Sequence, residues 1–168
     1  MREFKNIAEF VRFMQGRISD TGIVAEVGLA KAALAIEQEA KAEIGHYQES
    51  AGPFAGWKEL SGATLDGFDH PGAGAHIPGK RELGYASEGN DNPLLRDGGL
   101  RDSYEHTVHM REAAVGSNDD KAVWQEMGTP NARYPIEPRP VLGIAAVHKE
   151  HEAVDFIAEN IVRHIAGQ

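Results

Sequence analysis

The stretch WQEMGTPNARYPIEPRPVLG, residues 124–143, decides how the second half of the chain folds. It begins with a helix-like run that stops at Gly128, a residue free to adopt the left-handed conformation that ends helices. Four prolines follow, which hold the backbone extended and remove N–H donors that the centre of a sheet needs. A new apolar run begins at Val141. The stretch therefore predicts a helix, a stiff extended arm and a second helix.

Arg139 lies between Pro138 and Pro140 in this arm. One interpretation is that these residues form a rigid lead-in to the last helix, because proline fixes the backbone. The other is that the stiff arm presents the Arg139 guanidinium to a neighbouring molecule. The sequence leaves both interpretations open.

Helix signals flank the arm on both sides. The run DDKAVWQEMG predicts a short helix capped by Asp119 or Asp120, since aspartate accepts from free N–H groups at a helix start. Its Trp124 is expected in a core or an interface, because an indole gains much from burial and its N–H needs one partner. From Val141, apolar residues at steps of three and four predict a helix of more than about 20 residues. They include Ile144, Ala145, His148, Val154, Ile157, Ile161 and Ile165.

The first half of the chain predicts two helices in series. Apolar residues from position 4 to position 14 recur at helical spacing, and Gly16 is expected to end this short helix. Asp20 or Thr21 then caps a longer, alanine-rich helix that runs to about Tyr47. The stripe expected to be buried on the longer helix contains Ile23, Val27, Ala30, Leu34 and Ile44.

The middle of the chain, residues 52–99, holds 11 of the 19 glycines and 4 of the 8 prolines, too many for helix interiors or sheet centres. We expect a long loop excursion that binds something or orders in an assembly. Short structured islands are expected at WKELSGATL and NPLLRDGGLRDSY. After it, SYEHTVHMR alternates like a half-buried strand, and REAAVGS predicts a second strand after a tight turn.

This order of elements predicts an α+β fold in a single domain over residues 1–168. In it, a small antiparallel β-sheet packs against two long α-helices, with the long Gly/Pro-rich loop excursion at 52–99.

Composition and charge argue against several classes of function. Seventeen basic residues against 26 acidic ones give a net charge of −9, so a groove for phosphate backbones is not expected. The absence of cysteine rules out disulfides and thiolate metal sites and is typical of a reducing cytosol. The N-terminal segment lacks the apolar core of a signal peptide, and no apolar stretch has membrane-spanning length. We expect a soluble protein, made in the cytoplasm, that binds no membrane.

Two patterns suggest enzymatic sites and fail in detail. The run GAHIPGK has the spacing of a phosphate-binding loop, but Pro78 removes a donor N–H and Arg81 stands where a magnesium-binding Ser or Thr is needed. His148 and His151 lie one helical turn apart beside Glu152, a spacing that zinc accepts, yet no third ligand with matching spacing stands out. We therefore expect no catalytic residue, cofactor or metal.

Three segments in order resemble the tail-completion, virion-morphogenesis and head–tail joining (neck) proteins of tailed bacteriophages. They are WKELSGATL, PLLRDGGLRDSYEH and AAVGSNDDKAVWQEMGTPNARYPIEPRPVLGIA. In that family a Trp-centred segment precedes an LL-x-x-x-G-x-L-x-x-S element. A V-G-S/T-N strand end, a short helix ending in E/Q-x-G-T and a P-x-R-P motif before the last helix follow. The resemblance runs from about Trp57 to the C-terminus.

Matched residue by residue, the motif positions are expected at subunit interfaces. They are Leu95, Gly99, Leu100, Ser103, Trp124, Gln125, Gly128, Thr129, Arg139, Pro140 and Leu142. Val115, Gly116, Ser117 and Asn118 match the strand end of the family pattern.

The resemblance implies a structural virion protein rather than an enzyme. It would complete the tail or join head to tail at the phage neck, as a homo-oligomeric ring, a hexamer or dodecamer, around the DNA channel. Its partners would be head connector or adaptor proteins and tail proteins, and it would be assembled in the host cytoplasm. DNA would pass without specific binding, which an acidic channel wall favours.

Three alternatives to this function stay open. The first is a tail-terminator ring that caps the tail tube. The second is a small metal-dependent hydrolase that uses His148, His151 and Glu152. The third is a monomeric binding module whose recognition surface is the loop at residues 52–99.

Overall fold

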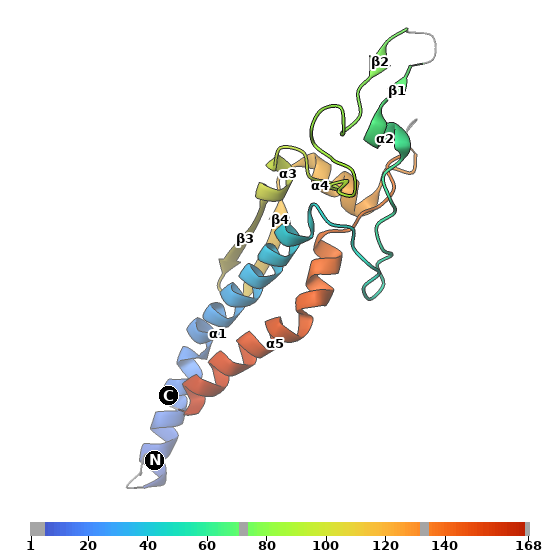
Figure 1. Cartoon of the computed structure of the whole chain (residues 1–168). Coiled ribbons are helices and arrows are strands. Elements are labelled where there is room, and N and C mark those ends of the chain that lie inside the picture. Colours follow the sequence, from blue (N-terminus) through green and yellow to red (C-terminus); the bar gives the residue numbers. More distant parts are fainter. Residues whose placement is uncertain (1–5, 71–73, 132–134, 167–168) are drawn as a thin grey trace. The chain divides into compact units, whose positions relative to one another are not determined.

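The computed structural model describes residues 6–70, 74–131 and 135–166, and it leaves out the side chains of residues 17–21 and 23. Its helices are α1 (Ile7–Glu43), α2 (Gly62–Asp66), α3 (Gly99–Asp102), α4 (Asp120–Met127) and α5 (Leu142–Ala166). Its strands are β1 (Phe68–Asp69), β2 (His76–Ile77), β3 (Tyr104–His109) and β4 (Glu112–Ser117), and Figure 1 shows all of these elements. The fold class is α+β, as predicted.

The chain divides into two compact units. Helices α1 and α5 and the β3–β4 hairpin each have residues in both. Unit 1 comprises Met1–Ile36, His106–Val115 and Lys149–Gln168. Unit 2 comprises Glu37–Glu105 and Gly116–His148.

Helix α1 is a single helix of 37 residues, so the prediction of two helices in series is wrong. Gly16 lies inside it, and a Cβ built there would meet nothing within 4 Å. One glycine within a helix costs only about 1 kcal/mol relative to alanine, which is too little to end a helix whose neighbours continue it. The expected caps, Asp20 and Thr21, fall within the helix, and their side chains are outside the description. The expected first residues, from position 4, also lie outside the described part.

The carboxyl end of α1 is at Glu43, four residues before the predicted end at Tyr47. Gly45 follows with φ +106°, a conformation that a side chain disfavours, and it donates its N–H to the carbonyl of Pro93. The helix therefore ends where the chain turns to contact the loop excursion.

Small side chains form the buried face of α1, and the predicted stripe was wrong at two of its five positions. Val27 and Leu34 are 47% and 41% exposed. The buried residues are Gly28, Ala32, Ala33, Ala35, Ala40, Glu43 and Ile44. Small residues allow another backbone to come close, whereas large residues keep it away.

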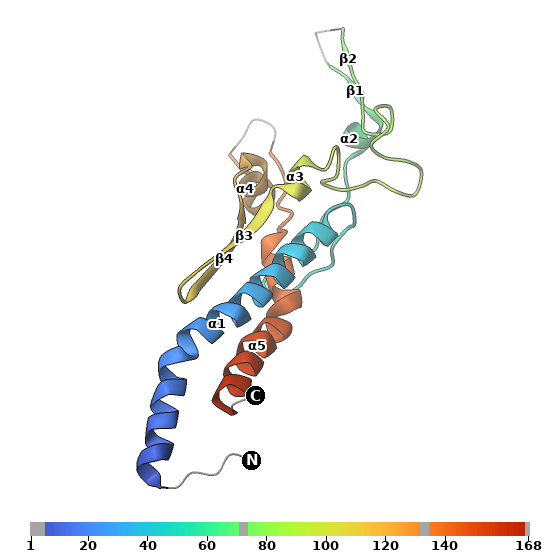
Figure 2. The same cartoon turned by 90° about the vertical axis from the view of Figure 1, so that its left-hand side faces the viewer.

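Within unit 1, α1 and α5 lie side by side at Gly28 (Figures 1 and 2). A Cβ added to Gly28 would lie 2.7 Å from Cα of Ile157 and 3.0 Å from the carbonyl oxygen of Phe156. These distances are shorter than ordinary contacts, so the two helix backbones touch at a point that only glycine permits.

Two short antiparallel ladders complete the fold. Strands β3 and β4 pair across a two-residue connection at Met110 and Arg111, which only an antiparallel hairpin allows. The burial of β3 alternates from Tyr104, which is fully buried, as the sequence pattern predicted. Strands β1 and β2 pair with Phe68 opposite Ile77, inside the excursion at residues 52–99.

Within the part of the chain that the structure describes, none of the helices combines the length and the hydropathy that a membrane-spanning segment needs.

The close approach at Gly28 predicts opposite effects for two glycine-to-alanine changes in the same helix. Gly28→Ala is expected to lower the free energy of unfolding by about 1–3 kcal/mol, because the α1 and α5 backbones must move apart. Gly16→Ala is the matched control and is expected to raise it by about 0.5–1 kcal/mol through helix propensity. Chemical denaturation followed by circular dichroism measures both. Equal effects of the two changes would contradict the contact.

Candidate functional site

The carboxylate of Glu126 on α4 holds the first turn of α5 in unit 2. It accepts the backbone N–H groups of Val141 at 2.7 Å, Leu142 at 3.0 Å and Gly143 at 2.8 Å. The first N–H groups of a helix lack partners within the helix, and the helix dipole makes its N-terminus attractive to negative charge. Both ends of this contact belong to the stretch 124–143, so the two helices and the arm form one connected structure.

The arm between these helices is also fixed by backbone contacts. The Arg139 N–H donates to the Gln125 carbonyl at 2.6 Å. The Thr129 N–H donates to the Ile136 carbonyl, and the Thr129 hydroxyl accepts from the Ile136 N–H at 2.8 Å. From the excursion, the Trp57 indole N–H donates to the Pro140 carbonyl at 2.9 Å. On both sides of residues 132–134, which the structure leaves out, the arm is therefore held by contacts with itself, with α4 and with the excursion.

Gly128 begins the arm with φ +70°. A Cβ there would lie 2.8 Å from the Ile136 carbonyl oxygen and 2.9 Å from Cγ of Pro138. The residue is thus required for the chain to fold back on itself, in addition to ending α4.

Arg139 points into unit 2. The residue is 9% exposed, and its Nη2 donates to the Lys58 carbonyl at 3.0 Å. Its Nε has no hydrogen-bond partner among the described residues, and burial lowers the pKa of its guanidinium. This position fits the interpretation of the Pro-Arg-Pro segment as a rigid lead-in to α5.

A cavity of about 540 Å³ opens beside Arg139. Gln125, Leu95 and Lys80 also line it. Lys80 donates its ammonium to the carbonyls of Asp91 and Asn92, and burial lowers its pKa. The lysine of the GAHIPGK run is therefore occupied by the chain's own carbonyls.

Most motif positions taken as interface residues are buried or half-buried in the folded chain. Ser103 donates to the Leu100 carbonyl and contacts the Ser117 hydroxyl at 2.6 Å. Pro140 is buried, whereas Trp124 is 47% exposed and Gly99 is also exposed. The half-buried positions are Leu95, Leu100, Ser103, Gln125, Gly128, Thr129 and Leu142. Their contacts with other subunits stay a prediction.

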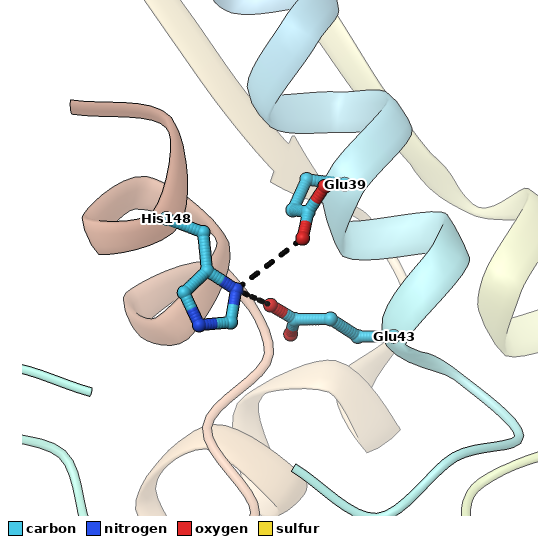
Figure 3. A group of neighbouring side chains, drawn as sticks. All are labelled: Glu39, Glu43 and His148. Atoms are coloured by element: carbon cyan, nitrogen blue, oxygen red, sulfur yellow. Dashed lines mark hydrogen bonds and ion pairs between the residues drawn. The ribbon is translucent and has the colours of Figure 1, made fainter. Parts of the chain in front are cut away.

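A second group of side chains brings α1 and α5 together within unit 2 (Figure 3). Glu39 and Glu43 lie one turn apart at the end of α1, and His148 lies in the second turn of α5. His148 Nδ1 is 3.3 Å from a carboxylate oxygen of Glu39 and 3.3 Å from one of Glu43. One potential ligand atom from each residue lies within 4.8 Å of the others, a separation that one metal ion can span.

Glu43 is the unusual member of this group. The residue is 3% exposed, and neither carboxylate oxygen has a hydrogen-bond partner in the described part of the chain. Burial raises the pKa of Glu43 to about 8, and the nearby carboxylates of Glu39 and Glu126 contribute to the rise. Burial likewise raises the pKa of the Tyr104 phenol, with the carboxylates of Glu126 and Glu43 adding to it.

The sequence pattern pointed to His148 but to the wrong companions. Glu152 is 2.9 Å from the ammonium of Lys149, and His151 is exposed, so neither belongs to the group around His148. The missed signal was the pair Glu39 and Glu43, whose four-residue spacing places both carboxylates on one helix face. That spacing is common on solvated helices, and only the packing of α5 against this end of α1 makes it informative.

Comparison with protein-family models, curated proteins and solved structures finds no match to this chain.

The Glu126 contact predicts a large loss of stability from a single truncation. Glu126→Ala is expected to lower the free energy of unfolding by about 2–4 kcal/mol, because three N–H groups lose a charged acceptor. Glu159→Ala is the control, since that exposed carboxylate forms a surface pair with Arg163 on α5, and a change within about 0.5 kcal/mol is expected. Urea denaturation compares them. Similar losses from both would show that Glu126 contributes no more than a surface pair.

The raised pKa of Glu43 predicts how stability depends on pH. The folded pKa of about 8 exceeds the reference value of 4.5, so the folded protein binds the proton more tightly than the unfolded chain. The contribution of this proton to the free energy of unfolding is complete below pH 4.5 and is lost as the pH rises to about 8. The groups that face Glu43 are Glu39, Glu126, Tyr104 and His148.

Glu43→Gln removes this titration. Relative to the wild type, the variant is expected to gain up to about 1.4 kcal/mol of stability per pH unit between pH 5 and pH 8. Urea denaturation at several pH values, with EDTA present to remove stray cations, measures the difference. Parallel pH profiles for the two proteins would contradict a proton held on Glu43.

Proposed function

We propose that this chain is a structural protein of a tailed bacteriophage that completes the tail or joins it to the head, acting as a ring of identical subunits. The order and spacing of the family motifs from about Trp57 onward support this proposal. One observation of the fold carries it further: α4 exposes three large apolar side chains.

The α4 face consists of Val123, Trp124 and Met127, which are 58%, 47% and 71% exposed. Spacings of one, three and four residues place the three side chains on one side of the helix. A large apolar side chain gains about 1.5–3 kcal/mol when it is buried, so an exposed group of three favours contact with another surface. Trp124 is the residue type expected for an interface anchor, since tryptophan is enriched among the residues that contribute most to binding energy.

A second copy of the chain is the partner proposed for this face. Unit 1 carries further exposed apolar side chains on both of its helices. They are Ile7, Phe10, Val11 and Val27 on α1 and Val154, Val162 and Ile165 on α5. Two different apolar surfaces on one chain favour heterologous contacts, which close into rings when the rotation between copies allows it.

The contact that anchors α4 supports the same interpretation. Glu126 of the same helix is fixed to the start of α5, so the α4 face is held in a defined direction. Pre-organisation of this kind lowers the entropy lost on association. The alternative ring function, a tail terminator that caps the tail tube, uses the same features.

The test is the effect of a charge in the α4 face on assembly. We expect the wild-type chain to form a ring in native mass spectrometry, and Trp124→Asp to shift it to monomers by placing a carboxylate in the apolar contact. Met110→Asp is the control, because Met110 is 67% exposed at the hairpin turn and its φ of +53° suits aspartate. A monomeric wild type, or equal disruption by both variants, would contradict the proposal.

Phage particles distinguish the two ring functions. A lysate that carries Trp124→Asp should contain filled heads beside unattached tails of normal length if the chain joins head and tail. Tails of uncontrolled length would instead identify a tail terminator. Intact, infectious particles would exclude both.

A further inference from the structure

We propose that Glu39, Glu43 and His148 bind one divalent transition-metal ion, with Zn²⁺ as the preferred occupant. All three residues belong to unit 2 of a single chain, so the site does not depend on assembly into a ring. The ion would connect the last turn of α1 to the second turn of α5.

The separations between the ligand atoms fit a metal centre. Zinc bonds to imidazole nitrogen and carboxylate oxygen are about 2.0–2.2 Å long, and a tetrahedral arrangement places neighbouring ligand atoms about 3.3 Å apart. The Nδ1 atom of His148 is 3.3 Å from one oxygen of Glu39 and 3.3 Å from one oxygen of Glu43. Figure 3 shows both carboxylates directed at this nitrogen from the same side of α1.

The burial of Glu43 is an independent indication that something is bound. A carboxylate that is 3% exposed normally accepts several hydrogen bonds, because removing a charge from water without compensation is costly. Both oxygens of Glu43 lack such partners within the described residues. The neighbouring Glu126 shows the contrast, since three backbone N–H groups compensate its charge.

An N–H group of His148 satisfies the two carboxylates less well than a metal ion would. Only the contact of Nδ1 with Glu39 has hydrogen-bond geometry, and the contact with Glu43 is an ion-pair distance alone. A single N–H points at one acceptor, whereas a cation placed between the three atoms contacts both carboxylates at once. Two charged oxygens and one imidazole also suit a transition metal better than Mg²⁺, which prefers oxygen ligands and octahedral geometry.

Three protein ligands leave at least one coordination position for water. The side chains of His148 and Glu39 are 40% and 28% exposed, so solvent reaches one side of the group while Glu43 lies on its buried side. The arrangement resembles the open zinc sites that have three protein ligands and a water molecule.

The experiment measures zinc binding by the untagged full chain after treatment with EDTA and buffer exchange. Isothermal titration with ZnCl₂ at pH 7.5 is expected to show one saturable site per chain, and zinc is expected to raise the melting temperature. MnCl₂ should bind more weakly than zinc, following the general order of divalent metals, and MgCl₂ more weakly still. A wild type that shows no saturable one-to-one binding would overturn the proposal.

Variants assign the binding to these residues. His148→Ala and Glu43→Gln are each expected to weaken zinc binding at least tenfold and to abolish the rise in melting temperature. His151→Ala is the matched control, since it removes an exposed imidazole from the same helix and should bind zinc as the wild type does.

Circular dichroism confirms that each variant is folded before the titration. If Glu43→Gln and His148→Ala do not fold, Glu39→Gln replaces them, because Glu39 is partly exposed and its loss leaves the core intact. Unchanged binding in the folded variants of the site, or an equal loss in His151→Ala, would overturn the assignment.

Discussion

The contact between Glu126 and the first N–H groups of α5 is the constraint on which the rest of unit 2 depends. It satisfies three donors that a helix cannot satisfy itself, and it places a negative charge at the positive end of the helix dipole. The contact fixes where α5 begins, and a helix rises about 1.5 Å per residue. The position of His148 opposite the end of α1 therefore follows from the start of α5 at Leu142.

The half-buried Glu126 and the buried Glu43 illustrate how different environments give the same group different roles. Glu126 is compensated by backbone N–H groups, and its charge stabilises the structure. Glu43 has no donors of this kind among the described residues. Its burial opposes its ionisation most, and the negative charges of Glu39 and Glu126 add to this effect. A proton or a cation must compensate the Glu43 carboxylate, and His148 lies where a cation would be shared. Moving the Glu126 carboxylate would therefore change the start of α5 and the electrostatic environment of Glu43 together.

Local signals in the sequence predicted the elements that end at glycine or begin at a capping aspartate. Asp119 caps α4, Gly128 ends it with a positive φ, and α5 begins one residue after the apolar run at Val141. The same reasoning failed at Gly16, because a glycine without a left-handed conformation does not stop a helix. It also failed for the buried face of α1, since large residues were expected inside and Gly28 with several alanines lie there instead. The group at Glu39, Glu43 and His148 depends on packing between distant segments, which no local pattern encodes.

Because most motif residues are buried or half-buried, few of them are available for the contacts between subunits that we propose. Arg139 donates to the Lys58 carbonyl, and the hydroxyls of Ser103 and Ser117 are hydrogen-bonded. The Thr129 hydroxyl accepts from the Ile136 N–H, so these side chains form contacts within the chain. Residues that build a rigid scaffold do not need to touch a partner to determine how one binds. They position α4, and the large apolar side chains that this helix exposes are Val123, Trp124 and Met127. Association is thus expected to depend on Trp124 directly and on the arm through the direction that it gives to α4.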